Sequence, residues 1–168
     1  NTSLTDNGLK MSQTLVLNKL KSLDIDTIFV SPYLRTLQTI QPYLVASNKK
    51  CNVEYALCEG NDEGSHGLGV DLNTIKRTHE QFNCNEYTSY IDMMDTMQSE
   101  TQNMILSRVD KFISSINETG NVLICSHQFI IHHIIGRIFD IDPIILDCKM
   151  GDVCVLDDTA DGVRLIVI

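Results

Sequence analysis

Hydrophobic residues recur at helical spacing in four parts of the chain, and short continuous apolar runs lie between them. An apolar residue at every third or fourth position indicates a helix with one buried face. We therefore predict helices over residues 5–23, 33–45, 100–116 and 129–138. Thr5 is the expected N-cap of the first helix, and Gly120 is the expected glycine C-cap after the third.

The apolar runs predict the strands. The runs at 27–30, 53–57 and 122–125 are short, and 153–156 and 163–168 flank a turn and so indicate a terminal hairpin. The run at 122–125 does not alternate, as is typical of a parallel strand buried on both faces. Since 27–30 and 122–125 each lead through a polar turn into a helix, we predict an α/β fold. The glycine-containing stretch 59–85 predicts a long irregular segment.

Composition narrows the class of protein. The 168 residues, 43% hydrophobic and 21% charged, fit one globular domain over 1–168. A net charge of −9 argues against nucleic acid and anionic membranes as partners, because both attract basic surfaces. No apolar run approaches the roughly 20 residues of a membrane span and no targeting signal is present, so we expect a cytoplasmic protein. The six cysteines form no C-x-x-C pair, which favours free thiols and no structural zinc.

Two polar residues follow predicted strands at comparable positions. Arg35 comes after the run at 27–30, and His127 comes after the run at 122–125. Polar groups at the carboxyl ends of neighbouring parallel strands converge on one crevice. The guanidinium fork of arginine matches phosphate oxygens two at a time. The pair therefore predicts a site for phosphate or for a small phosphorylated substrate.

The order Ser31-Pro32-Tyr33-Leu34-Arg35, followed much later by Ser126-His127, resembles the histidine phosphatase superfamily, which has the phosphoglycerate-mutase-like fold. The segment Leu4-Thr5-x-x-Gly8 and the segment from Ser99 to Arg108 are similar to further parts of the family's pattern. The resemblance implies a three-layer α/β/α sandwich with a mostly parallel sheet. It also implies phosphoryl transfer that needs neither a cofactor nor a metal.

The resemblance assigns roles to the residues that match. Arg35 would bind the phosphoryl group, and His127 would be the second histidine of the catalytic site. Glu59 matches the acidic proton donor best, and Glu63 before Gly64 is the alternative. Gln128 stands where a glycine is most often found, so it would leave a backbone donor for phosphate and narrow the room beside it.

One part of the family's pattern is missing. Its nucleophile is a histidine in an Arg-His-Gly motif that ends the first strand, and no histidine precedes His66 here. That strand lies between the Ser-His strand and the terminal hairpin, so its absence would leave two rows of backbone groups unpaired. We therefore expect either a fragment of a longer phosphomonoester hydrolase with its nucleophile upstream, or a degenerate copy that closes its sheet differently. The alternative function is a pseudophosphatase that binds a phospho-ligand or a protein without turnover.

Overall fold

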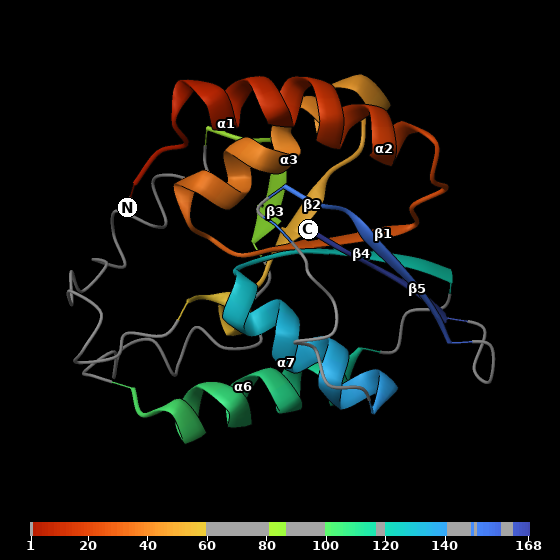
Figure 1. Cartoon of the computed structure of the whole chain (residues 1–168). Coiled ribbons are helices and arrows are strands. Elements are labelled where there is room, and N and C mark those ends of the chain that lie inside the picture. Colours follow the sequence, from red (N-terminus) through yellow and green to blue (C-terminus); the bar gives the residue numbers. More distant parts are fainter. Residues whose placement is uncertain are drawn as a thin grey trace.

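A six-stranded, mostly parallel sheet forms the middle layer of the computed structural model (Figure 1). The structure describes residues 2–59, 81–86, 100–116, 120–140, 149, 151–158 and 163–168. The strands are numbered as in Figure 1: β1 (Thr27–Val30), β2 (Cys51–Val53), β3 (Cys84–Glu86), β4 (Gly120–Cys125), β5 (Cys154–Asp158) and β6 (Val163–Val167). Their order across the sheet is β3-β2-β1-β4-β6-β5, and only the β5–β6 pair is antiparallel.

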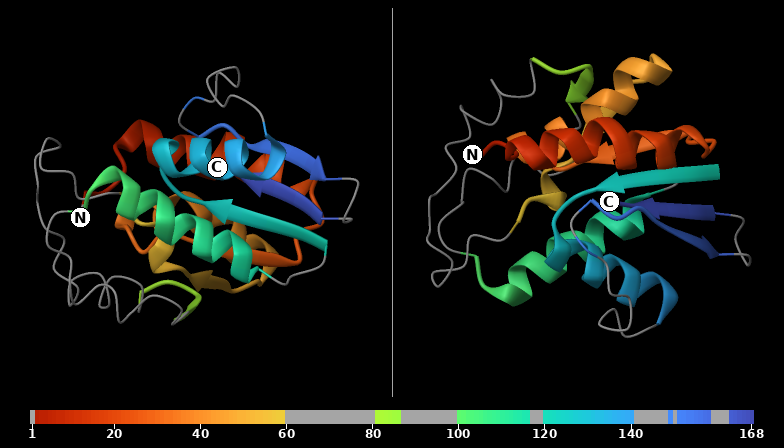
Figure 2. Two further views of the ribbon diagram at one scale, coloured as in Figure 1. Left: turned by 90° about the horizontal axis from the view of Figure 1, so that it is seen from below. Right: turned by 45° about the horizontal axis from the view of Figure 1, so that its top comes forward.

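Helices cover both faces of this sheet. One face carries α1 (Asp6–Met11), α2 (Leu17–Lys21) and α3 (Leu34–Ser47), and the other carries α6 (Gln102–Ser115) and α7 (Gln128–Phe139), as the views of Figures 1 and 2 agree. The three layers confirm the predicted α/β/α sandwich. Within the described residues, no helix has the length and apolar character needed to cross a lipid bilayer.

The core lies in two clusters, one on each side of the sheet, and the central strands contribute to both. In β1, Ile28 and Val30 pack with the α1–α3 layer, whereas Phe29 packs with the α6–α7 layer. The Phe29 ring meets the Phe112 ring of α6 edge to face, with ring centroids 5.2 Å apart. Burial of both faces explains why these strands read as continuous apolar runs.

Most predicted elements are confirmed, and Thr5 caps the first helix by accepting a hydrogen bond from the Gly8 amide. The single helix expected over 5–23 is interrupted by a π-helical turn, Ser12–Val16. The strand predicted over 53–57 is wrong beyond Val53, because Tyr55–Leu57 forms a 3₁₀ turn. The Glu54 carboxylate accepts from the Ala56 amide at 2.7 Å and so favours a turn in what reads as an apolar run.

Gly120 does not cap a helix, as we expected, but begins β4 with φ +97°. A Cβ at this position would lie 2.3 Å from Oδ2 of Asp26, so the left-handed backbone and the close approach both require glycine. The Asp26 carboxylate accepts from the Asn121 amide at 2.8 Å and anchors this end of the strand. Most of the irregular segment predicted over 59–85 lies outside the described residues, but 84–86 form the edge strand β3.

The expectation of two unpaired rows beside the Ser-His strand is wrong. The terminal strand β6 lies parallel to β4, with Val122 opposite Leu165 and Ile124 opposite Val167. The ladder continues past the strand, because the Ser126 amide donates to the carbonyl of Ile168 at 3.1 Å. The hairpin thus closes the sheet by placing β6 between β4 and β5.

Candidate functional site

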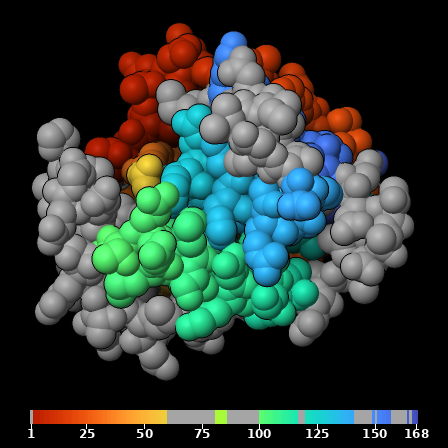
Figure 3. All heavy atoms as spheres, turned by 60° about the horizontal axis from the view of Figure 1, so that its bottom comes forward, coloured from red at the N-terminus to blue at the C-terminus, as the bar shows by residue number. Residues whose placement is uncertain are grey.

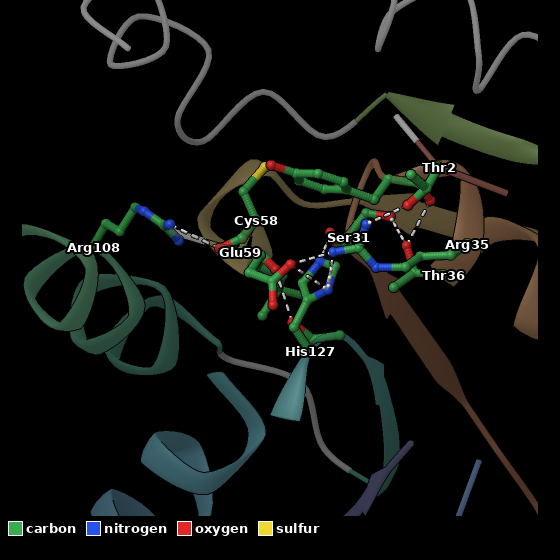
Figure 4. A network of polar contacts seen from close by, with 11 residues as sticks. Thr2, Ser31, Arg35, Thr36, Cys58, Glu59, Arg108 and His127 are labelled. Carbon is green, nitrogen blue, oxygen red and sulfur yellow. Dashed lines mark hydrogen bonds and ion pairs between the residues drawn. The ribbon is translucent and has the colours of Figure 1, made fainter. Parts of the chain in front are cut away.

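The candidate site lies where β1 and β4 end and α3 and α7 begin. The Ser31 amide donates to the carbonyl of Cys125 at 2.9 Å, which joins the two strand ends. The Thr36 hydroxyl lies 2.7 Å from the carbonyls of both Ser31 and Tyr33, so it holds the turn that starts α3. Arg35 is the second residue of that helix and therefore projects over the ends of both strands (Figure 4).

His127 is the residue immediately before α7, and both of its ring nitrogens are engaged. Nε2 lies 2.9 Å from the Ser31 hydroxyl, and Nδ1 lies 3.0 Å from the Arg35 guanidinium. A guanidinium can only donate, so Nδ1 accepts and the proton of the neutral ring is on Nε2, which donates to Ser31. The two strand ends thereby select one tautomer and one ring orientation.

The protonation state of His127 follows from its surroundings. Only 6% of this residue is exposed, and burial, with smaller contributions from Arg35 and Arg108, lowers its pKa to about 3. Each of these causes disfavours the imidazolium, the first by desolvation and the others by repulsion. The ring is consequently neutral near pH 7 when no anion is bound.

Tyr33 packs against both side chains that the sequence placed in the site. Its ring meets the His127 ring edge to face, with centroids 4.9 Å apart, and the Arg35 guanidinium lies 4.7 Å from the Tyr33 centroid. The second contact is a cation–π interaction, which restricts the long Arg35 side chain. Burial raises the pKa of Tyr33, so its phenol remains neutral.

Glu59 follows the 3₁₀ turn after β2 and lies beside both Arg35 and His127. Its carboxylate forms an ion pair with Arg35 and lies 3.8 Å from Nδ1 of His127. About half of the Glu59 side chain is exposed to solvent, compared with 27% of the Arg35 side chain. The acid therefore lies at the solvent side of the pair, where a leaving group could approach it.

The chain before Glu59 is held at three consecutive carbonyls. Arg108 of α6 donates to the carbonyls of Ala56 and Cys58, the latter at 2.7 Å, and the Ser126 hydroxyl donates to the carbonyl of Leu57 at 2.8 Å. The other side of the Arg108 guanidinium pairs with Glu100 at 2.9 Å. Figure 4 shows Arg108 reaching from its helix towards this turn. Arg108 is 4% exposed, so it acts as a buried clamp on the segment that carries Glu59.

The N-terminal segment lies beside the same site. Gln38, three residues after Arg35 in α3, accepts from the Leu4 amide at 2.8 Å and from the Ser3 hydroxyl at 3.0 Å. Arg35 also donates to the Thr2 hydroxyl at 3.4 Å. In the space-filling view, the red N-terminal segment and the yellow segment of the residues in the fifties lie next to the first turn of α7 (Figure 3).

A cavity of about 480 Å³ adjoins these groups. Arg35, Glu59 and His127 line its polar end, and Gln128 lies there too. The rest of the wall has apolar side chains from the first helix and the ends of β4 and β6, and the charged side chains of Lys149 and Asp152 also line it. The apolar residues include Met11, Val16, Cys125, Val167 and Ile168. The volume is typical of a small-molecule site.

The other residues considered from the sequence fall into three groups. Gln128 is exposed at the start of α7, where free backbone amides favour an anion. Glu63, His66 and His79 lie outside the described residues. His132 lines the cavity, but its buried Nε2 has no hydrogen-bond partner within the described part of the chain.

Two buried thiols, those of Cys58 and Cys125, lie close to the site. Burial raises the pKa of Cys58 to about 12 and that of Cys125 to about 12, so both thiols stay protonated and are poor nucleophiles. Over the ranges that the structure describes, no group of three or more His, Cys, Asp or Glu side chains is arranged to hold a metal ion.

The structure thus brings Arg35, His127 and Glu59 together, as the sequence predicted. Sequence reasoning assigned no role to Ser31, Tyr33 or Arg108, although each belongs to a segment on which the resemblance rested. Their position in those segments is the sequence feature that could have identified them as residues of the site. An arginine nine-tenths buried in a helix cannot be distinguished from a surface arginine by residue type alone.

Comparisons with known proteins support the fold and identify the family. The model of the histidine phosphatase superfamily (branch 1) matches residues 1–166. No curated protein matched the chain in the corresponding sequence search. Among solved structures, the ecdysone phosphate phosphatase from Bombix mori, in complex with tungstate, is 22% identical with a TM-score of 0.65, and the match covers 94% of this chain but 62% of that one.

Two further structures have the same fold. The alpha-ribazole phosphatase from Shigella flexneri is 18% identical with a TM-score of 0.64, over 97% of this chain and 81% of that one. The phosphoserine phosphatase from Entamoeba histolytica, in complex with 3-phosphoglyceric acid, is 19% identical with a TM-score of 0.55, over 98% and 82%. At such identities the likeness establishes the fold, and the family match over 1–166 establishes descent: this chain belongs to the histidine phosphatase superfamily.

Proposed function

We propose that this chain is the phosphoryl-binding part of a phosphomonoester hydrolase that works through a phosphohistidine and needs no metal. The observation that carries the proposal is the convergence of Arg35, His127 and Glu59 at the polar end of one cavity (Figure 4). Phosphoryl transfer depends mainly on positioning and on positive charge near the equatorial oxygens. The substrate class is a small phosphorylated molecule, the kind of ligand seen with the Entamoeba histolytica structure.

Arg35 and His127 would hold the phosphoryl group together. A bound dianion would compete with the Glu59 carboxylate for Arg35, because both accept hydrogen bonds from the same guanidinium. It would also place negative charge beside His127 and so raise the proton affinity of that ring. The amides of the first turn of α7, beginning at Gln128, would supply further donors to the phosphate.

Glu59 would act as the general acid, with Glu63 as the alternative in the undescribed part of the chain. In the first step a histidine nitrogen bonds to phosphorus, the ester P–O bond breaks, and Glu59 protonates the leaving oxygen. In the second step water attacks the phosphohistidine and releases inorganic phosphate. The accepting histidine would belong to a segment upstream of these residues. A strand that carried it between β4 and β6 would have to replace the pairing of those two strands, and its histidine would then face the cavity lined by Gln128, Gly8 and Ile168.

Intact mass and activity of the natural protein test this proposal. We expect a mass above the 18.9 kDa of the present chain, with upstream residues that include Arg-His-Gly. That longer protein should hydrolyse phosphomonoesters in the presence of a metal chelator. Failure to turn over any of a broad set of phosphomonoesters would contradict the hydrolase.

A pseudophosphatase is the second candidate, and one observation favours it. Across the ranges that the structure describes, His127 is the only histidine at a strand end, and the nearby thiols of Cys58 and Cys125 are protonated. A natural protein of 18.9 kDa that binds tungstate and turns over nothing would favour this function. Turnover by these 168 residues alone would contradict it.

A further inference from the structure

Two thiols face each other across the pair of strands at one edge of the sheet, away from the candidate site. Cys51 begins β2 and Cys84 begins β3, and the two residues are directly opposite in the parallel register. The two side chains are close enough for each to shift the pKa of the other. Cys51 is fully buried and Cys84 is partly exposed, so a small reagent in solvent reaches the pair through Cys84.

The backbone geometry is compatible with a covalent link. Neighbouring strands lie about 4.8 Å apart, and disulfides span Cα separations of about 4.4 to 6.8 Å. Strand β3 is short, Cys84–Glu86, and is the end strand in the described sheet. Only one neighbouring strand therefore restrains the small shift that a disulfide requires.

We propose that Cys51 and Cys84 are a redox-active pair that forms a reversible disulfide by exchange with a low-molecular-weight disulfide such as oxidised glutathione. The Cys84 sulfur attacks one glutathione sulfur, forms a mixed disulfide and releases one glutathione thiol. The Cys51 sulfur then attacks the Cys84 sulfur and releases the second glutathione thiol. Two protein thiols are oxidised, one small disulfide is reduced to two thiols, and both protons pass to the departing glutathione sulfurs.

The contrast between the two thiols sets this order of events. The interaction with Cys51 lowers the pKa of Cys84, whereas the same interaction and burial raise the pKa of Cys51. A thiolate is the attacking species in disulfide exchange, so the partly exposed Cys84 reacts first. The Cys51 thiol lies 4.0 Å from the carbonyl of Asn83, and the Cys84 thiol lies 3.6 Å from the carbonyl of Phe82.

The disulfide would close a loop between residues 51 and 84, which includes Glu59 and the clamped turn before it. Closing a loop of this length restricts the unfolded chain and raises the temperature of unfolding by about 5 to 10 °C. It would also fix the edge strand β3 to β2. Oxidation would therefore alter stability without touching Arg35 or His127.

The test is a redox titration of the folded chain with reduced and oxidised glutathione, followed by digestion and mass spectrometry. We expect one peptide that links residues 51 and 84, a mass lower by about two hydrogens, and a higher unfolding temperature that reverts on reduction. Cys51→Ala should accumulate glutathione on Cys84, and Cys84→Ser should form no linked peptide. Cys154→Ser, on the other edge of the sheet, is the matched control and should leave the link intact.

The result with the unaltered chain decides the proposal even if a variant fails to fold. A linked peptide that joins any other pair of cysteines would overturn it. So would a 51–84 link that forms only after denaturation, or the absence of the link at glutathione ratios that modify other thiols of the folded chain.

Discussion

The Arg35 guanidinium lies 3.0 Å from Nδ1 of His127 and donates a hydrogen bond to it. The same guanidinium forms an ion pair with Glu59. One cation therefore fixes the tautomer of the histidine and restrains the acid, so each of the three side chains depends on the other two. Substitution of any one of them should change how the site binds anions or protons, and the buried clamp behind Glu59 should control stability.

Stability should fall as the pH is lowered from about 6.5 to 3. The folded pKa of His127 is about 3, against 6.5 for the unfolded ring, so the unfolded chain binds the extra proton across this range. Stability then rises with pH by as much as about 1.4 kcal/mol per unit. Urea unfolding between pH 4 and 7 measures the slope. His127→Asn should reduce the slope of the free energy of unfolding with pH. An unchanged slope in that variant would mean that other titratable groups cause the pH dependence.

Arg35→Ala should weaken binding of tungstate or sulfate by about 10-fold to 100-fold, since charged hydrogen bonds contribute about 1.5 to 3 kcal/mol. Isothermal titration calorimetry measures the affinity. Arg137→Ala removes an equal charge from an exposed position on α7 and should leave the affinity nearly unchanged. Equal losses in the two variants would mean that anions respond to overall charge and not to this site.

Glu59→Gln should increase the affinity for sulfate by roughly twofold to fivefold. The variant removes a carboxylate that competes with the anion for Arg35, and exposed ion pairs are worth about 0.2 to 1 kcal/mol. In an active longer protein, the same change should lower turnover of esters with poor leaving groups more than that of esters with good ones. Weaker sulfate binding by Glu59→Gln would contradict the competition.

Arg108→Met should destabilise the fold by about 3 to 5 kcal/mol, because it leaves the mostly buried Glu100 without its cation and two carbonyls without donors. Lys111→Met, on an exposed face of the same helix, is the control and should change stability little. Chemical unfolding at pH 7 compares the two. Similar losses in both variants would contradict the clamp.

Residue patterns predicted the α/β class and the convergence of Arg35 and His127, whereas the three-layer arrangement came from the resemblance to the family. The runs at β1 and β4 could be recognised as strands from the sequence. Both faces of these strands are buried, so their residues are apolar without alternation. Arg35 and His127 could be paired from their positions in the sequence, because parallel strands bring their carboxyl ends to one edge of a sheet.

Tertiary contacts decided what the patterns left open. The run at 53–57 is as apolar as a strand, but the Glu54 side chain and the donors from Arg108 and Ser126 make it a turn that presents Glu59. The position of β6 beside β4 could not be predicted from the sequence either, because the sequence of a hairpin does not specify which strand of the sheet it pairs with. Local composition determines which residues are buried, but long-range hydrogen bonds determine which groups meet, and the site depends on both.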